Sequence, residues 1–231
     1  MYQLSYFPNS QNVSGVQAYD KEVEALNLHT KADKVYIVCS KEQLDENGSM
    51  KIFSMIDKLS AELSVASDNE TRKRLLMRRA IAHSVLRDFE AAISDFTYYI
   101  SLDDKNSLAY WQRAVCQAEM DEFNKAEGKG VLNIHSAEAD FSDAIRQNSN
   151  NAYIYYNRGN LHAGRNELSK AIDDYTIALR IDNRLAEAYY NRGIARAKSG
   201  NKQTAIQDLS KAGELGLYDA YSVIKRLNKS K

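Results

Sequence analysis

The chain repeats part of its own sequence at a fixed spacing. The block YYNRG at residues 155–159 occurs again at 189–193, a shift of 34 residues. A second block repeats in step with it, because AIDDY at 171–175 corresponds to AIQDL at 205–209. A period of 34 residues is typical of arrays in which each repeat is a helical hairpin and neighbouring hairpins stack to bury a continuous core.

The same landmarks continue upstream and define four repeats, at residues 73–106, 107–151, 152–185 and 186–219. The second repeat is 45 residues long because an insertion follows Ala126. We expect this insertion, residues 127–137, to form a protruding loop, with room for one extra helical turn. A neutral insertion and a binding element are both compatible with its sequence.

Small and bulky residues recur at matching positions when each repeat is counted from its first residue. Antiparallel helices approach closely only where side chains are small, and a bulky residue then fills the space between hairpins. Position 8 is Ala80, Ala114, Gly159 and Gly193, position 20 is Ala92, Ala137, Ala171 and Ala205, position 24 is Phe96, Phe141, Tyr175 and Leu209, and position 27 is Tyr99, Ala144, Ala178 and Ala212.

This pattern resembles the tetratricopeptide repeat, which has small residues at positions 8, 20 and 27 and an aromatic residue at 24. The resemblance implies an all-α fold, an α-α superhelix or solenoid, with a first and a second helix in every repeat. Two departures concern the turns and one helix contact. Position 32, usually Pro in the family, is Asp104, Ser149, Asn183 and Leu217 here, and position 4, often Trp, is Leu76, Tyr110, Tyr155 and Tyr189. Tyr99 is a separate misfit, because it is large where position 27 is usually small.

The flanking segments are predicted to cap the array. Apolar residues at helical spacing predict a capping helix and linker over residues 49–72, with Ile52, Phe53, Ile56, Leu59 and Leu63 on its apolar face, and residues 220–231 read as a C-terminal capping helix. Residues 1–48 are expected to be irregular and partly β, with strand-like runs at 2–7 and 35–39. Residues 7–27 resemble the region before the last repeats of long bacterial multi-repeat proteins. That likeness implies the C-terminal part of a larger, exported protein; without it, a cytoplasmic location is the alternative.

Composition excludes several classes of partner. Lys plus Arg and Asp plus Glu both total 31, so no bulk field attracts nucleic acid. The start of the chain lacks the features of a signal peptide, and no apolar stretch approaches a membrane span. Cys39 and Cys116 offer neither a disulfide framework nor a metal motif. His29, His83, His135 and His162 lack metal-ligand spacing, so we expect no cofactor, no metal and no enzyme activity.

One arginine and one aspartate recur in every repeat. Position 7 is Arg79, Arg113, Arg158 and Arg192, and position 23 is Asp95, Asp140, Asp174 and Asp208. The double recurrence predicts a ladder of structural ion pairs, because each guanidinium then has a carboxylate of its own. Capture of an anion by the arginines is the alternative.

The resemblance places one stripe of each first helix on the concave side of the superhelix. The residues predicted to line this groove are Met77, Trp111, Tyr153, Tyr156, Asn157, Asn160, Tyr190 and Asn191. Trp and Tyr are common binding hot spots, and an Asn amide can pair with the backbone of an extended peptide. Two alternatives stay open: these side chains pack adjacent first helices together, or the N-terminal segment of the chain itself occupies the groove.

The predicted function is a non-catalytic scaffold that binds a protein or extended peptide. Family members that grip acidic chaperone tails carry Lys at position 5 and Asn at position 9, where this chain has Met77 and Ile81, so a neutral to apolar ligand is expected. The alternative is an architectural segment of a larger exported protein with no ligand in the groove. The ligand, the pathway and the oligomeric state are not encoded in any motif of the chain.

Overall fold

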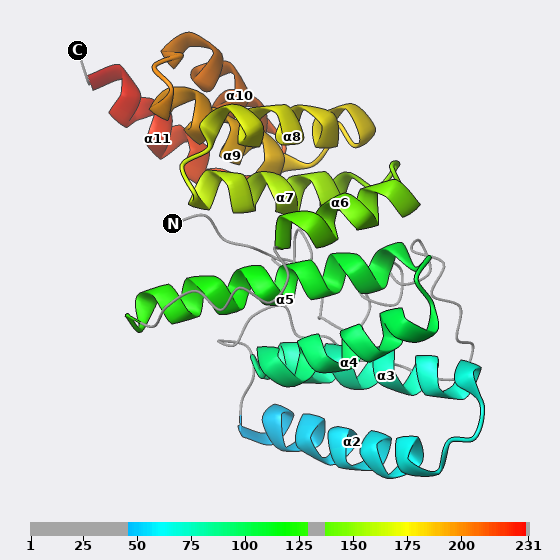
Figure 1. Cartoon of the computed structure of the whole chain (residues 1–231). Helices are drawn as coiled ribbons and strands as arrows, with labels where there is room; N and C mark the ends of the chain where they lie inside the picture. Colours follow the sequence, from blue (N-terminus) through cyan, green and yellow to red (C-terminus); the bar gives the residue numbers. More distant parts are fainter. Residues whose placement is uncertain (1–45, 129–136, 230–231) are drawn as a thin grey trace. The chain divides into compact units, whose positions relative to one another are not determined.

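The described residues of the chain fold into α-helices only. A computed structural model describes residues 46–128 and 137–229, and these ranges contain ten helices and no strand (Figure 1). The helices are α2 (Glu46–Val65), α3 (Asn69–Val85), α4 (Phe89–Leu102), α5 (Ser107–Ala126), α6 (Ala137–Gln147), α7 (Ala152–Gly164), α8 (Leu168–Ile181), α9 (Ala186–Lys198), α10 (Lys202–Glu214) and α11 (Asp219–Lys229). The predicted strand-like runs and most of the insertion lie outside the described residues.

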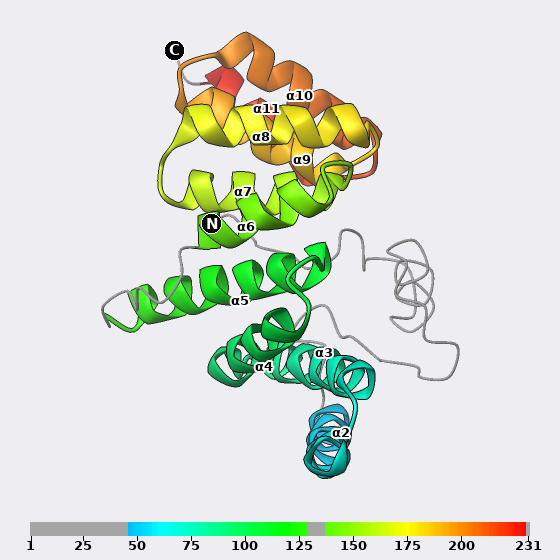
Figure 2. The same ribbon diagram turned by 45° about the vertical axis from the view of Figure 1, so that its right-hand side comes forward.

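The described helices divide into two compact units. One contains α2 to α5 and the other contains α6 to α11, with the division between Ser136 and Ala137. Within each unit, helices that follow one another in the chain pack side by side (Figures 1 and 2). The division falls inside the predicted second repeat, so the pairing of α5 with α6 as one hairpin stays a prediction.

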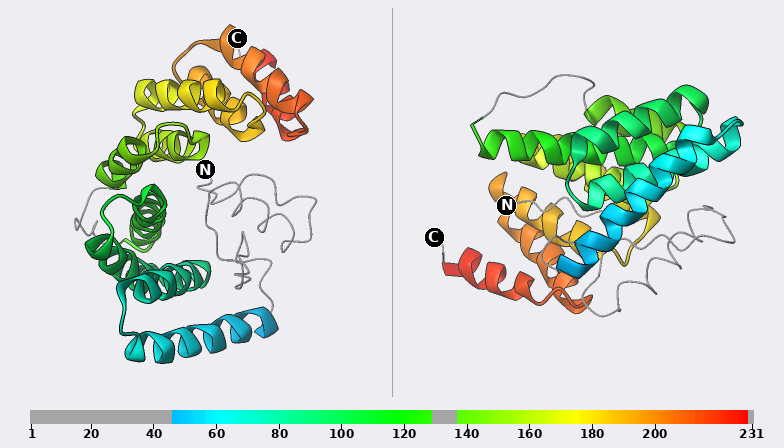
Figure 3. Two further views of the ribbon diagram at one scale, coloured as in Figure 1. Left: turned by 90° about the vertical axis from the view of Figure 1, so that its right-hand side faces the viewer. Right: turned by 90° about the horizontal axis from the view of Figure 1, so that it is seen from below.

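In the first unit, α2 packs against α3, in the place predicted for a capping helix (Figure 3). Ile52 and Leu59 are buried, and α2 begins earlier than the prediction, at Glu46. Phe53 was expected on the apolar face, but its side chain is 57% exposed. It follows Ile52 directly, and successive helical residues point about 100° apart, so both cannot lie on one narrow stripe.

The repeated small residues lie where helices of one pair meet. A methyl group added at Gly159 would lie 2.8 Å from the Tyr175 ring, and one at Gly193 would lie 2.9 Å from Leu209 Cγ. The residue at position 24 is fully buried in all four repeats. The residue at position 20 is also fully buried, except that Ala137 is 1% exposed. The glycines thus allow α7 to approach α8 and α9 to approach α10 closely enough for the bulky residue to fit between them.

A local hydrogen bond explains why the large residue Tyr99 occupies position 27 of the first repeat. Its hydroxyl accepts a hydrogen bond of 2.8 Å from Asn106 Nδ2, and the Asn106 side chain also accepts one from the backbone N–H of Ala109 at the start of α5. Burial raises the pKa of the Tyr99 phenol, which keeps it neutral. Tyr99 therefore supports the turn between α4 and α5.

Left-handed residues end three first helices at the same position of the repeat. Arg87, Asn166 and Gly200 follow α3, α7 and α9 with φ of 61°, 60° and 83°. In each case the next residue donates its N–H back to a carbonyl of the last turn, the helix stop seen with left-handed C-terminal residues. The first helix of the second repeat, α5, instead continues to Ala126, and its left-handed residue is Gly128 with φ of 70°. The residues just before the insertion therefore extend the helix, and the described part of the insertion begins as a helix end.

Candidate functional site

Three of the predicted arginine–aspartate pairs are formed by two-pronged hydrogen bonding. Nε and an Nη of the arginine donate to the two oxygens of one carboxylate at 2.8 and 2.6 Å in Arg79–Asp95, 2.9 and 2.7 Å in Arg158–Asp174, and 2.9 and 2.8 Å in Arg192–Asp208. Each joins the first and second helix of one pair. The hydrogen bonds to Asp raise the pKa of the Arg79 and Arg158 guanidinium groups, so both pairs stay charged.

The remaining nitrogen of each position-7 arginine reaches an upstream hydroxyl, which the sequence analysis missed. Arg113, Arg158 and Arg192 donate at 3.0, 3.3 and 3.0 Å to Thr97, Ser142 and Thr176, all at position 25 of the preceding repeat. Arg79 uses Ser60 of α2 at 3.0 Å. Each arginine therefore links its own helix pair to the preceding helix. The recurrence of Ser or Thr at position 25 was the available signal.

The fourth predicted pair is divided between the two units. Arg113 belongs to the first unit and Asp140 to the second, and both side chains are buried. Their pairing stays a prediction. Arg113 also lies over the ring of Tyr110, three residues before it, at 5.8 Å, and Arg158 and Arg192 have the same contact with Tyr155 and Tyr189.

Most predicted groove residues are buried. Met77, Trp111, Tyr156, Asn157, Asn160 and Asn191 all fall in this class, and Trp111 is only 1% exposed. A ligand could reach them only through rearrangement of the chain around them. Tyr153 and Tyr190 are partly exposed and present accessible surface. The alternative in which the N-terminal segment occupies the groove concerns residues outside the described ranges.

A buried amide and phenol network connects α7, α8 and α9. Asn160 Oδ1 accepts a hydrogen bond from the Tyr175 hydroxyl and another from Asn191 Nδ2, both at 2.8 Å. Asn191 Nδ2 also lies 3.3 Å from the Tyr156 hydroxyl oxygen, which accepts from it. Four buried polar groups thus satisfy one another, and the first helices α7 and α9 are held together at the predicted groove positions.

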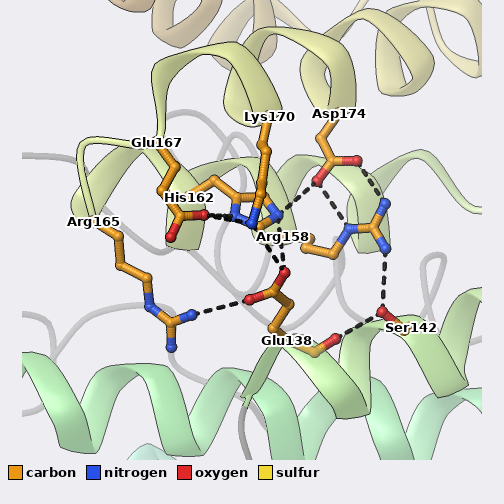
Figure 4. A network of polar contacts seen from close by, with 8 residues as sticks. All are labelled: Glu138, Ser142, Arg158, His162, Arg165, Glu167, Lys170 and Asp174. Carbon is orange, nitrogen blue, oxygen red and sulfur yellow. Dashed lines mark hydrogen bonds and ion pairs between the residues drawn. The ribbon is translucent and has the colours of Figure 1, made fainter.

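A second polar network surrounds His162 in the last turn of α7 (Figure 4). Its Nδ1 lies 2.8 Å from Glu167 Oε2, while its Nε2 lies 3.7 Å from Asp174 Oδ2 and 4.0 Å from Glu138 Oε1. Lys170 contacts both glutamates, and Arg165 contacts Glu138 (Figure 4). Hydrogen bonds from Lys170 and His162 lower the pKa of Glu167, and the contact with Glu167 raises the pKa of Lys170.

The sequence could not predict this network from spacing. Glu138, His162 and Glu167 come from α6, α7 and the residue that precedes α8, and no short motif contains all three. A histidine at position 11 followed by an acid at position 16 recurs, as His83 and Asp88 in the first repeat, and this repeated pair was the only local signal.

Comparison with known proteins identifies the repeat. A family model described as TPR repeat matches residues 163–200, from the end of α7 through α9. Residues 163–200 therefore contain a tetratricopeptide repeat (TPR). The comparison with curated proteins found no match.

Solved TPR structures share the fold. A crystal structure of MamA is 21% identical, with a TM-score of 0.62 over 77% of this chain and 98% of that chain. YrrB is 16% identical, with a TM-score of 0.57 over 90% of this chain and 98% of that chain. TTC0263 of Thermus thermophilus is 17% identical, with a TM-score of 0.56 over 78% of this chain and 94% of that chain. The fold class is therefore the all-α TPR solenoid.

Among the helices that the structure describes, none combines the length and the apolar character needed to cross a membrane.

Proposed function

We propose that this TPR protein is a non-catalytic scaffold that binds a neutral to apolar protein segment on the first-helix face of α7 and α9. TPR proteins generally mediate protein interactions. One relative by fold, YrrB, is described as a TPR protein with an unusual peptide-binding site, which supports peptide binding as a capability of this fold.

The observation that carries the proposal is the contrast between two tyrosines and the residues beneath them. Tyr153 and Tyr190 are partly exposed, and both border buried apolar clusters of the second unit. The neighbouring Asn160 and Asn191 are tied into the amide network. Partly exposed tyrosines on a rigid base lose little side-chain entropy when they bind, which favours them as anchors.

In this proposal the buried groove residues have a supporting role. Trp111, Tyr156, Asn157, Asn160 and Asn191 fix the first helices, and Tyr153 and Tyr190 contact the partner. Each of three recurring arginines already forms an ion pair with an aspartate of its own repeat, which disfavours capture of an external anion as the function. The pairs are Arg79–Asp95, Arg158–Asp174 and Arg192–Asp208.

Selection from a random peptide display library against the full chain tests the proposal. We expect enrichment of uncharged, apolar sequences whose affinity falls about 30-fold when Tyr190 is replaced by Ser, the loss of about 2 kcal/mol expected of a hot spot. Tyr153→Ser should weaken binding in the same direction. Tyr98→Ser and Tyr218→Ser are matched controls, because those tyrosines are exposed on α4 and just before α11.

Two results would support the architectural alternative instead. One is failure to enrich any peptide; the other is binding that the control substitutions weaken as much as the substitutions at Tyr153 and Tyr190. A loss of thermal stability in Tyr190→Ser with unchanged peptide affinity would likewise assign this side chain to helix packing alone.

A further inference from the structure

His162 and the carboxylates around it lie close enough together to hold a metal ion. The ligand atoms of Glu138, His162 and Glu167 all lie within 4.8 Å of one another. These residues come from α6, the last turn of α7 and the residue before α8, so the chain brings them together only by folding (Figure 4).

The two nitrogens of the buried His162 ring have different surroundings. Nδ1 donates to Glu167 at 2.8 Å, a normal hydrogen-bond length. Nε2 makes no hydrogen bond within the described part of the chain, although its side chain is only 4% exposed. Nε2 instead faces Asp174 Oδ2 and Glu138 Oε1, at 3.7 and 4.0 Å.

Those separations are too long for hydrogen bonds and suit a shared cation. Ligand atoms bound to zinc at about 2.0–2.1 Å in tetrahedral geometry lie about 3.4 Å apart. A small rotation of the half-exposed Glu138 side chain would reach that spacing. A carboxylate that holds the opposite ring nitrogen, as Glu167 does here, is the usual support of a metal-binding histidine.

The first repeat supplies an internal comparison. His83 occupies the equivalent position and donates from Nδ1 to Asp88 at 2.9 Å. Within the described residues no second carboxylate lies near its other ring nitrogen. The histidine–acid pair by itself therefore belongs to the helix turn, whereas the additional oxygens of Glu138 and Asp174 are specific to His162.

The carboxylates near Nε2 already have cationic partners, which a metal ion would have to share or displace. Both oxygens of Asp174 bind Arg158, and Glu138 Oε2 lies 3.2 Å from Arg165, while Glu138 Oε1 meets Lys170 at 3.5 Å. The Lys170 side chain is 57% exposed and can turn into solvent without leaving a buried cavity. Its ammonium group already contacts Glu138 Oε1, so a divalent ion bound to that oxygen would compete with it.

We propose that this cluster binds a borderline divalent metal ion of the zinc type. His162 Nε2 and Glu138 Oε1 are the ligands, Asp174 Oδ2 is shared with Arg158, water completes the shell, and Glu167 positions the imidazole. A nitrogen and oxygen donor set with one imidazole selects Zn²⁺ over Mg²⁺. The ion would join α6 to α7 and α8 within the second unit.

Isothermal titration of the full, metal-free chain with ZnCl₂ tests the site, with MgCl₂ as the comparison ion. We expect one saturable Zn²⁺ site and, at about 100 times the dissociation constant, a rise of about 5–10 °C in the unfolding midpoint. Lys170→Met should tighten binding by about tenfold, since it removes the competing charge. His162→Gln should abolish the site, and His83→Gln should leave it unchanged.

The controls separate this site from the thiols and from a folding defect. Lys170→Met and Glu167→Gln change side chains that are at least partly exposed, so we expect both variants to fold. Circular dichroism of each variant checks this before titration. Cys39→Ser with Cys116→Ser should keep the site, and bound Co²⁺ should show no thiolate charge-transfer band. Absence of saturable Zn²⁺ binding, or binding that Lys170→Met weakens or His162→Gln leaves intact, would overturn the proposal.

Discussion

The pair formed by Arg79 and Asp95 offers a quantitative test of the arginine ladder. Asp95 is almost fully buried and Arg79 is 22% exposed, and two hydrogen bonds of 2.6 and 2.8 Å join them. The relevant changes are Asp95→Asn, Arg79→Met and the double variant. Methionine keeps the apolar stem of the arginine and removes its five donors.

The expected cost follows from what each change leaves buried. Loss of one partner of a buried pair costs about 3–5 kcal/mol, and the partial exposure of Arg79 lowers this to about 2–4 kcal/mol for either single variant. Arg79→Met also loses the hydrogen bond to Ser60, worth about 1 kcal/mol. The double variant leaves no unpaired charge, so we expect it to be less destabilised than the sum of the two by about 2 kcal/mol.

Urea unfolding followed by the helical circular dichroism signal measures these free energies. The slope of the transition must match between variants, because repeat arrays can unfold in parts. Ser60→Ala isolates the hydroxyl contact and should cost about 1 kcal/mol. A coupling energy below about 0.5 kcal/mol would show that the pair does not stabilise the array, and it would reopen anion capture as the role of the recurring arginines.

Three further predictions concern packing, turns and pH. Gly159→Ala should destabilise the protein by about 1–3 kcal/mol in urea unfolding, since its methyl group would meet the buried Tyr175 ring at 2.8 Å; an unchanged midpoint would mean that the ring can move. Gly200→Ala meets no atom within 4 Å, so its cost should be only the left-handed backbone, about 1 kcal/mol by thermal unfolding, and a larger loss would contradict this assignment. Burial raises the pKa of Glu119 above its ordinary value of 4.5, so its contribution favours the folded state at low pH and is lost as pH rises through the folded pKa. Glu119→Gln should therefore raise the midpoint temperature of thermal unfolding at about pH 8 and change it little at about pH 4. A larger rise at about pH 4 than at about pH 8 would contradict the argument from burial.

The helical array could be predicted because its determinants are local and periodic. The places of Gly159 and Gly193 in the repeat predicted a close approach of helices, and a methyl group added at each would meet the facing side chain of position 24. Arg and Asp recur 16 residues apart in three of the repeats, and this recurrence predicted pairs such as Arg158–Asp174. The prediction was possible because both residues of such a pair lie in the same helical hairpin.

Other features depend on geometry that the period does not contain. The helix α5 extends to Ala126 and its left-handed residue is Gly128. A repeat alignment does not encode where a helix stops. The burial of Trp111 depends on the residues that cover this face of α5. Helical spacing predicts on which face a side chain lies, but it does not predict what covers that face. The convergence of Glu138 with His162 requires α6 to lie beside α7, a contact that no single repeat specifies.

The two proposed sites share helix α7 and can be tested separately. Tyr153 is in the first turn of α7 and His162 is in the last, and a rise of about 1.5 Å per residue puts them about 14 Å apart along the helix axis. The Asn160 network contains none of the proposed metal ligands. The Arg158–Asp174 pair shares Asp174 with the metal site and contains neither tyrosine of the peptide site. Zinc bound at His162 is therefore about 14 Å along α7 from Tyr153, and we expect any effect of the metal on peptide affinity to pass through the packing of α7 with its neighbouring helices.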